Sequence, residues 1–419
     1  MIILFASLTV LYVSWIFILL TKKEKNISKF FFPDLSVILP AHNEEDAIKE
    51  TVKSILDSEY PSNIEIVVIN DGSSDNTAKI VKNLQKENNI IKLYTTNHIG
   101  KSRALNFGVT KASFNYFLFL DADSSIEKDT LKEIVKPLSE GDIGASSGIV
   151  RAKIKLNPLT WFQDFEYILS SGWRYLCFLI GSVSVLPGFL VIKKDVFKKI
   201  GGFSQDTLTE DFDITLSLKK AGYNAAVTTK AVMYTSTPAS IKTLFKQRIR
   251  WGRGNFQVIK KHSDMLFSKK FGPIGYFTIP TQLYWYLFSI LYLPSVLYWF
   301  FSDYYRYFFV QGVFISKDVI LYLFKWISSY GMLDLIFKVF TGVYSINPLI
   351  LATIINYIVT IFYNILIFFN VGKIKFVNFI AYLFIFPYYL FIIFIQFTAT
   401  IYEIYNSIVR KKTTNVWSK

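Results

Sequence analysis

The chain has 419 residues, of which 52% are hydrophobic, and it carries a formal net charge of +15. A chain this apolar does not divide into two soluble domains, although its length would allow two. Its basic residues flank hydrophobic stretches and form no compact basic domain, which argues against nucleic-acid binding. We interpret the positive charge as basic residues on the cytoplasmic side of a membrane, facing anionic lipid. The single cysteine, Cys177, allows no internal disulfide and no cysteine metal site.

Residues 1–21 are predicted to form an N-terminal transmembrane helix. The first 20 residues are uncharged and apolar, about the length that crosses a bilayer. No basic segment precedes them and no small-residue cleavage site follows, so we expect a retained anchor rather than a signal peptide. Lys22, Lys23 and Lys25 come next, and the positive-inside rule then places the following domain in the cytoplasm. The expected location is the plasma membrane, crossed several times.

Between residues 35 and 235, short apolar runs alternate with amphipathic helical patterns. The expected strands are Leu35–Leu39, Ile64–Ile69 and Tyr116–Leu120. One helix should end near Leu56, and Ser73 or Ser74 can cap the next. This alternation predicts an α/β domain with a parallel, Rossmann-like sheet. Ligands of such sheets bind at the carboxyl ends of the strands.

Two acidic groups stand at these strand ends. Asp121 and Asp123 follow one strand, so their carboxylates can meet at one Mg²⁺ or Mn²⁺ ion that bridges a diphosphate. Asp71 ends what we take as the neighbouring strand and can accept hydrogen bonds from a ribose or a base. Alternatively, Asp71 and Gly72 only form a turn. Lys101, at the start of a predicted helix, can face a phosphate or a base, or can simply be solvated.

A third acidic group, Glu210 and Asp211, follows the turn Gly201–Gly202 and precedes a helix. Acids at a helix N-terminus are favoured by the macrodipole without any catalytic duty. In the functional interpretation, Asp211 is a general base that takes a proton from an acceptor hydroxyl. A divalent metal would neutralise charge on the departing diphosphate. Direct attack by that hydroxyl, with no protein nucleophile, inverts the anomeric centre.

A basic and aromatic segment follows the domain. Residues 236–278 should be interfacial, with an amphipathic helix over Ile241–His262 that lies on the membrane surface. Its apolar residues recur at helical spacing (Ile241, Leu244, Phe245 and Ile249), with the basic residues Lys242, Lys246, Arg248 and Arg250 between them. The helix also contains Gln247 and Trp251. Trp251 can stack on a pyranose ring, while Arg248 or Arg250 can bind diphosphate oxygens. Alternatively, these side chains only anchor the helix among lipid headgroups.

Residues 279–402 are predicted to form a C-terminal membrane domain, followed by a basic tail over residues 403–419. The expected spans are Ile279–Phe301, Leu349–Phe369 and Val377–Tyr402. The segment Val319–Tyr344 contains Lys325, Asp334 and Lys338, which are unfavourable in lipid. We expect it to span nonetheless, because the tail is then cytoplasmic.

Two further features bear on the membrane domain. The polar residues Asn356, Asn364 and Gln396 within the spans indicate helix packing or a polar path. The apolar run Tyr175–Ile192 is interrupted by glycine, serine and proline, and a crossing there would put Asp211 across the membrane from Asp121. We therefore assign this run to the α/β domain.

Together these motifs resemble family 2 membrane glycosyltransferases with a GT-A catalytic domain, such as cellulose, hyaluronan, chitin and poly-N-acetylglucosamine synthases. The resemblance covers Leu35 to His262. The motifs that carry it are Pro40–Glu44, Asp71–Ser73, Gly100–Lys101, Asp121–Asp123, Thr209–Asp211 and Gln247–Trp251. The chain is most similar to bacterial poly-β-1,6-N-acetylglucosamine synthases, although His42 replaces the tyrosine that is commoner before Asn43.

The resemblance implies roles for single residues. Asn43, Glu44, Asp71, Lys101 and Asp121 would bind the donor nucleotide, with Asp71 and Lys101 at its uridine part. The metal would lie at Asp123 with Asp121. Asp211, with Glu210 beside it, would be the base. The acceptor and diphosphate site would be formed by Gln247, Arg248, Arg250 and Trp251.

These roles predict an inverting membrane glycosyltransferase. UDP-N-acetylglucosamine is the preferred donor, with UDP-glucose next. A growing β-linked polysaccharide would be the acceptor, exported through the spans. One alternative is a non-processive enzyme that adds a single sugar to a lipid acceptor. Another is a transporter or scaffold whose catalytic domain has degenerated. Membrane lipids are expected partners in each case.

Overall fold

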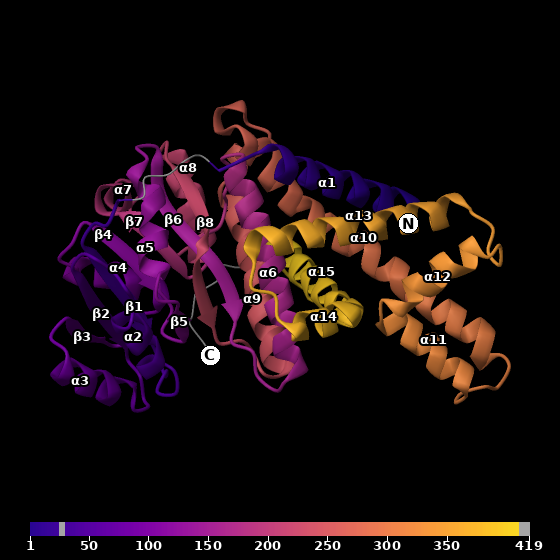
Figure 1. Ribbon diagram of the computed structural model, residues 1–419, viewed down its shortest axis with the longest axis horizontal. Helices are drawn as coiled ribbons and strands as arrows, with labels where there is room; N and C mark the ends of the chain where they lie inside the picture. Colours follow the sequence, from indigo (N-terminus) through magenta and orange to yellow (C-terminus); the bar gives the residue numbers. More distant parts are fainter. Residues whose placement is uncertain (25–29, 410–419) are drawn as a thin grey trace.

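An eight-stranded mixed sheet lies at one end of the molecule and a bundle of long apolar helices at the other (Figure 1). The computed structural model describes residues 1–24 and 30–409. The sheet has the order β3-β2-β1-β4-β7-β6-β8-β5. Its strands are β1 (Leu35–Ala41), β2 (Ile64–Asp71), β3 (Ile91–Thr96), β4 (Tyr116–Leu120), β5 (Ser124–Ile126), β6 (Ile143–Ala152), β7 (Phe189–Lys193) and β8 (Asn224–Thr235).

The first half of this sheet confirms the predicted strands. β1, β2 and β4 begin where expected, and every residue of β1 is buried, as expected of a strand covered on both faces. β3, β2, β1 and β4 pair in parallel. β1 separates β2 from β4, so Asp71 and Asp121 lie at the same edge of the sheet but not on neighbouring strands.

A wholly parallel sheet is wrong for the second half. β7 is antiparallel to both β4 and β6, and β5 is antiparallel to β8. β6 and β8 pair in parallel. The run Tyr175–Ile192 therefore ends in a strand of the sheet, which confirms its assignment to the α/β domain. It reaches β7 through turns at Gly181 and Gly188, both with positive φ.

Helices cover both faces of the sheet. They are α2 (Ile48–Leu56), α3 (Thr77–Glu87), α4 (Lys101–Lys111), α5 (Thr130–Val135), α6 (Pro158–Leu179), α7 (Lys194–Lys199) and α8 (Glu210–Lys220). α2, α3 and α5 share one hydrophobic core with the sheet, while α4, α7 and α8 share the other. Capping of α3 by Ser73 or Ser74 is wrong, because Asn76 occupies its N-cap position and Asp75 Oδ1 accepts from Thr77 N at 3.0 Å.

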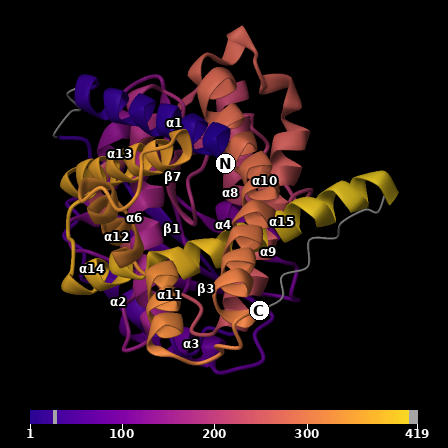
Figure 2. The ribbon, with the colours of Figure 1, turned by 90° about the vertical axis from the view of Figure 1, so that its right-hand side faces the viewer.

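Among the described residues, four helical segments are long and apolar enough to cross a membrane. They are α1 (Ile2–Thr21), the segment Ile274–Phe309 that contains α10 (Ile279–Tyr304), α13 (Pro348–Val371) and α15 (Ile385–Val409). α1 and α13 lie side by side (Figure 2), where Asn356 Nδ2 donates to Thr9 Oγ1 at 3.2 Å. The third predicted span starts later than expected, because the separate helix α14 (Phe376–Leu383) precedes α15.

The segment Val319–Tyr344 is not one continuous helix. It forms α11 (Lys317–Ile327) and α12 (Tyr330–Phe340), which are bent by 104°. Asp334 lies 2.7 Å from Lys325 Nζ and 3.1 Å from Lys338 Nζ, so the charges that made a span unfavourable offset one another. Of the basic groups used to orient the chain, Lys25 and residues 410–412 lie outside the described residues.

α6 connects the sheet to the helical bundle. It packs on β6 and also on α13 and α14. Asp164 of α6 is fully buried and accepts from Arg151 Nε at 2.8 Å and from Arg151 Nη2 at 2.7 Å. Asn378 of α14 donates to the same carboxylate at 2.9 Å. One buried ion pair therefore joins a strand, the shared helix and the bundle.

Replacing Asp164 by alanine should destabilise this connection strongly. The guanidinium of Arg151 is 1% exposed, and a buried charge left without its partner costs about 3–5 kcal/mol. We expect a clearly lower unfolding midpoint for Asp164→Ala in detergent. Glu59→Gln, which breaks an exposed pair with Lys132, is the control and should leave the midpoint unchanged. Equal midpoints for the two variants would contradict a stabilising role for the buried pair.

Candidate active site

A small pocket at the carboxyl end of β4 gathers charged groups from three distant segments. It is lined by Lys101 from α4, Asp121 after β4, and Glu210 and Asp211 from α8, with Gly188 at its edge. These residues are separated by up to about a hundred positions in the chain, and the sheet order brings them together. The sequence predicted each of the four charged side chains, but not that Lys101 would stand among the acids.

Lys101 lies between two carboxylates. Its Nζ is 2.7 Å from Asp121 Oδ1 and 3.0 Å from Glu210 Oε1. Burial lowers the pKa of Lys101, but these two acids outweigh it and raise the pKa above its usual value. The ammonium therefore stays charged and ties the end of β4 to the start of α8. Its predicted contact with uridine stays a prediction.

The pKa values of Glu210 and Asp211 shift in opposite directions. Burial raises the pKa of Glu210, but Lys101 and Arg250 more than offset it and hold that pKa below its usual value. Burial, together with the neighbouring charge of Glu210, raises the pKa of Asp211 to about 6, against the opposing effect of Lys101. Adjacent acids whose pKa values are pushed apart suit different roles. Asp211 has the pKa expected of a general base near neutral pH.

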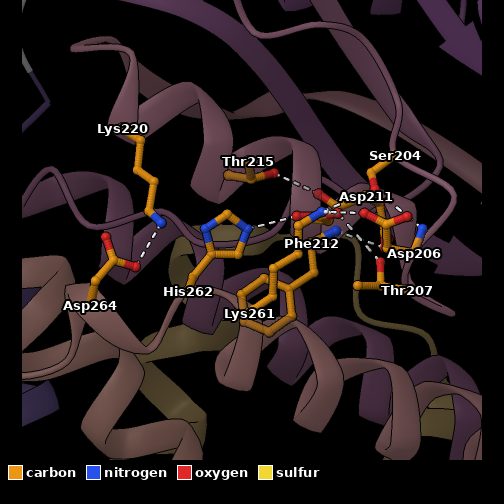
Figure 3. Close-up of polar contacts among 11 residues, drawn as sticks. Ser204, Asp206, Thr207, Asp211, Phe212, Thr215, Lys220, Lys261, His262 and Asp264 are labelled. Carbon is orange, nitrogen blue, oxygen red and sulfur yellow. Dashed lines mark hydrogen bonds and ion pairs between the residues drawn. The ribbon is translucent and has the colours of Figure 1, made fainter. Parts of the chain in front are cut away.

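The start of α8 holds Asp211 in place. Phe212 N donates to Asp211 Oδ1 at 2.9 Å, and Thr215 Oγ1 donates to the Asp211 backbone carbonyl at 2.7 Å (Figure 3). Thr209 is the N-cap residue, so Glu210 and Asp211 lie in the first turn of α8 rather than before it. The macrodipole therefore also acts on these acids, so the helix-capping and catalytic interpretations share this geometry.

Asp121 and Asp123 are the carboxylates that the sequence predicts as metal ligands. Asp123 Oδ1 accepts from Thr235 Oγ1 at 3.2 Å. Within residues 1–24 and 30–409, no three histidine, cysteine, aspartate or glutamate side chains are arranged to hold a metal ion. Mg²⁺ usually takes one or two carboxylates and completes its shell with water and substrate phosphates. As hard oxygen donors, these two carboxylates have the chemistry for an ion that arrives with a diphosphate. Asp121 Oδ1 already lies 2.7 Å from Lys101 Nζ, and the predicted metal role of both residues stays a prediction.

The Asp71 carboxylate is hydrogen-bonded to the end of β3 and to the loop between β3 and α4. This carboxylate is fully buried. Oδ1 accepts from Thr96 Oγ1 and Ile99 N, both at 2.7 Å, and Oδ2 accepts from Gly100 N at 2.8 Å. These bonds hold the loop that leads directly to Lys101. The predicted contact of Asp71 with a ribose or base stays a prediction.

The sequence analysis did not predict that the two histidines beside Asp71 contact each other. The rings of His42 and His98 lie 4.1 Å apart, and Nδ1 of each is within 3.2 Å of the Asp71 backbone carbonyl. Gly72, at φ 66°, allows this approach, since a Cβ there would lie 2.7 Å from His98 N. The Asp71–Gly72 turn was the only sequence signal for this arrangement.

Asn43 and Glu44 brace the neighbouring turns. Asn43 Oδ1 accepts from Ser74 N at 2.9 Å, and Glu44 N donates to Thr77 Oγ1 at 2.8 Å. Asn43 adopts a positive φ of 54°, a conformation that asparagine tolerates better than most residues. These contacts connect the turns after β1 and β2. Their predicted role toward a nucleotide stays a prediction.

The segment Gln247–Trp251 lies on α9 (Ile241–Lys261), as expected. However, the residues that α9 buries and exposes differ from the prediction. Arg248, expected on the polar face, is only 5% exposed and donates to Glu166 Oε2 at 2.9 Å. Its guanidinium lies 4.0 Å from the Trp251 ring centroid. Ile241, expected on the apolar face, is 64% exposed. α9 is packed against α15 and α8, so its buried face includes this arginine.

This packing separates the two arginines. Arg248 is engaged by Glu166 and Trp251, while Arg250 lies close enough to Glu210 to lower its pKa. The predicted contacts of Arg248 and Arg250 with a diphosphate stay predictions. Trp251 also stacks on Tyr167 of α6, with ring centroids 6.5 Å apart. The predicted contacts of Gln247 and Trp251 with an acceptor stay predictions.

The α/β domain matches known proteins in both sequence and fold. The family model described as "Glycosyl transferase family 2" matches residues 36–201. A mannosyltransferase from Pyrobaculum calidifontis, solved with GDP-Man and Mn²⁺, has a TM-score of 0.59 and 19% identity, covering 88% of this chain and 98% of that protein. This likeness shows a shared GT-A fold.

Curated relatives extend the family 2 match along the chain. The poly-β-1,6-N-acetyl-D-glucosamine synthase of Staphylococcus epidermidis is 32% identical over 228 residues, which are 54% of this chain and 55% of that protein. The synthase of Staphylococcus aureus is 30% identical over 240 residues, covering 57% and 58%. The probable glycosyltransferase YdaM of Bacillus subtilis is 32% identical, covering 59% and 62%. The chain thus spans little more than half the length of the curated relatives it matches.

Gly188 gives a direct test of how Asp121 is held. A Cβ at this position would lie 2.4 Å from Asp121 Oδ2, so Gly188→Ala should displace the carboxylate. We expect weaker binding of Mn²⁺ and nucleotide in calorimetry, with the fold retained. Gly181→Ala is the matched control, because Gly181 also has a positive φ but has no atoms within 4 Å of its Cβ position. Equal binding by both variants would show that the position of the Asp121 carboxylate does not affect binding of Mn²⁺ and nucleotide.

Proposed function

We propose that the chain is an inverting membrane glycosyltransferase that transfers a sugar, N-acetylglucosamine by preference, from a UDP-sugar to a growing β-linked polysaccharide. The observation that carries the proposal is the pocket in which Lys101 and Asp121, from the segment that matches the family 2 model, meet Glu210 and Asp211. The curated relatives include poly-β-1,6-N-acetyl-D-glucosamine synthases, which supports this choice of donor and product.

In this mechanism Asp211 accepts the proton of the acceptor hydroxyl as that hydroxyl attacks the sugar. The raised pKa of Asp211 suits this task, and attack without a protein nucleophile inverts the anomeric carbon. Lys101 and Arg250 supply positive charge beside the pocket. When bound through Asp121 and Asp123, Mg²⁺ or Mn²⁺ would supply charge stabilisation for the leaving diphosphate.

The acceptor would approach from the side of α9. Trp251 would stack on its terminal sugar, held in place by Arg248 and Tyr167. Gln247 would add a hydrogen-bonding group, and Arg250 would bind the diphosphate as a fork. Asn43, Glu44 and Asp71 would act on the donor side, where they already shape the loops around the expected nucleotide.

The long apolar helices fit a membrane protein. We propose a multi-pass plasma-membrane enzyme, in contact with membrane lipids, whose α/β domain faces the cytoplasm and whose spans export the product. Asn356 bonds to Thr9 between α13 and α1, so this polar residue supports packing rather than a path. Asn364 is also buried among the helices. Export therefore rests on the kinship with polysaccharide synthases more than on these side chains.

A panel of radiolabelled nucleotide sugars tests the proposed function. Detergent-solubilised protein is incubated with each donor and Mg²⁺ or Mn²⁺, and incorporation and product size are scored together. A high-mass product from UDP-N-acetylglucosamine is expected. A single glycolipid would instead support the non-processive alternative, and turnover of no donor would support a transporter or scaffold.

Asp211→Asn should stop transfer while leaving donor binding nearly intact. The amide keeps the shape of the side chain but cannot accept the proton, so turnover should fall by about 10²–10⁴-fold. A base acts on the chemical step, so the loss should appear in kcat rather than in donor affinity. Asparagine is well tolerated at helix N-termini. Transfer at a near wild-type rate would therefore identify Asp211 as structural and make Glu210 the first alternative base.

The same base predicts a pH dependence. Asp211 must be ionised to accept a proton, and its raised pKa means that the ionised fraction falls below pH about 6. The value of kcat/KM reports groups of the free enzyme, so it should decline on the acid side of pH about 6. The residual activity of Asp211→Asn should lack this decline. An acid limb that persists unchanged in the variant would assign it to another group.

Asp123→Asn should remove activity by weakening binding of the divalent ion and diphosphate. The residue follows a strand end and lies outside the hydrophobic cores, so the variant should stay folded. Calorimetry with Mn²⁺ and UDP should report weaker binding, and circular dichroism should match the wild type. Full turnover in excess chelator would rule the metal-dependent mechanism out.

A further inference from the structure

A buried carboxylate behind the pocket joins α8 to the C-terminal end of α9. Asp213, in the first turn of α8, is fully buried. Its Oδ1 lies 2.6 Å from His262 Nε2, and its Oδ2 accepts from Lys261 Nζ at 2.7 Å. His262, the C-cap residue of α9, is only 4% exposed. We call Asp213, Lys261 and His262 the helix joint.

The helix joint also holds the loop that leads into α8. Lys261 Nζ donates to Ser204 Oγ at 3.0 Å and lies 3.5 Å from Asp206 Oδ2 (Figure 3). Thr207 Oγ1 donates to the Asp213 carboxylate at 3.5 Å. The residues before Glu210 are therefore attached to α9 as well as to α8.

α9 also touches the N-terminus of α8 without spare room. A Cβ on Gly254 would lie 2.6 Å from Thr209 Cγ2, next to Glu210 in the chain. Gln257 Oε1 accepts from Leu208 N at 3.3 Å. Since α9 also carries Trp251, one rigid helix touches the base segment and presents the proposed acceptor motif.

The opposite charges in the helix joint stabilise it. Burial by itself raises the pKa of Asp213, but His262 and Lys261 more than offset it and keep that pKa below its usual value. The carboxylate is therefore ionised, and a buried ion is stable only while its partners remain. Neither Asp213 nor His262 lines the pocket, so the proposed chemistry gives them no direct task.

We propose that the helix joint positions the base Asp211 relative to the acceptor motif on α9, and so favours transfer to a sugar over transfer to water. The inference rests on the proposed function. Asp213, Lys261 and His262 are positioning residues, because they act through the helices and touch no substrate. A sugar acceptor must be held by both helices at once, whereas a water molecule needs no contact with Trp251.

Loosening the helix joint should change the ratio between two reactions of the donor, which are transfer to a sugar acceptor and hydrolysis. A misplacement of about 1 Å between reacting groups can reduce a rate by about 10²-fold. Loosening the joint should therefore reduce transfer to a sugar much more than hydrolysis of the donor. A merely stabilising role would reduce both reactions in parallel, through loss of folded protein.

The test compares both reactions in the full-length protein in detergent. Lys261→Met, His262→Gln and His262→Ala are incubated with radiolabelled UDP-N-acetylglucosamine, with and without a β-linked N-acetylglucosamine oligosaccharide. We expect transfer to fall by about 10- to 100-fold and the acceptor KM to rise. Donor KM and hydrolysis should stay within about threefold of wild type. Lys261→Arg should restore most of the transfer, because it keeps the charge that Asp213 requires.

The matched control is Asp264→Asn. It breaks the neighbouring Lys220–Asp264 pair of 2.6 Å, in which Asp264 is 60% exposed, and should change neither reaction (Figure 3). Unchanged partitioning in the joint variants, or parallel loss of both reactions, would overturn the inference. If His262→Ala fails to fold, Lys261→Met and His262→Gln still decide the matter.

A second readout does not depend on activity. Hydrogen exchange of the amides of residues 208–212 should become faster in Lys261→Met and stay unchanged in Asp264→Asn. If the wild type turns over no nucleotide sugar, the proposed function fails, and this exchange still reports whether the joint holds the base segment. Unchanged exchange in Lys261→Met would overturn the positioning role itself.

Discussion

The ammonium of Lys101 holds the candidate site together. It is shared by Asp121, which ends a strand, and Glu210, which begins a helix, at distances of 2.7 and 3.0 Å. Without a cation between them, two carboxylates in so small a pocket would repel each other. The lysine itself is presented by the loop that Asp71 holds through three hydrogen bonds. The fold of one loop therefore decides whether acids from distant segments can coexist.

The same charge balance separates the two acids of α8. Glu210 is compensated by Lys101 and Arg250, whereas Asp211 receives less compensation and feels the charge of Glu210. Adjacent residues thus acquire different proton affinities from their surroundings alone. This difference makes Asp211 the better candidate for a base, which the sequence of the motif alone does not decide.

Local patterns predicted the elements that depend on local chemistry. The buried strands β1, β2 and β4 are short apolar runs, and Asp121, Asp123 and Glu210 follow them or a glycine turn, so their places in the chain were readable. Antiparallel β7 was not, because its direction depends on which strands it meets across the sheet. Gly188 was recognised only as an interruption of an apolar run, because its closeness to Asp121, a residue 67 positions away, depends on the fold.

The face of α9 shows a second limit of prediction from sequence. Periodicity grouped Arg248 with the polar residues, but Glu166 and Trp251 provide it with a buried site. Likewise, no sequence pattern indicated that Asp213 and His262 would pair, because their 2.6 Å contact forms only when α8 packs on α9. Partners distant in sequence, and not intrinsic polarity, decided which of these side chains are buried.

The shared helix α6 has a consequence for how such a protein can change. One side of α6 covers the sheet, and at Gly172 it approaches Ile367 of α13 so closely that a methyl group would lie 2.4 Å from that side chain. If the α/β domain were joined to the helical bundle of another protein, the outer surface of α6 would not fit the helices of that bundle. Chimeras between relatives should therefore exchange α6 together with α13 and α14, as one inherited unit.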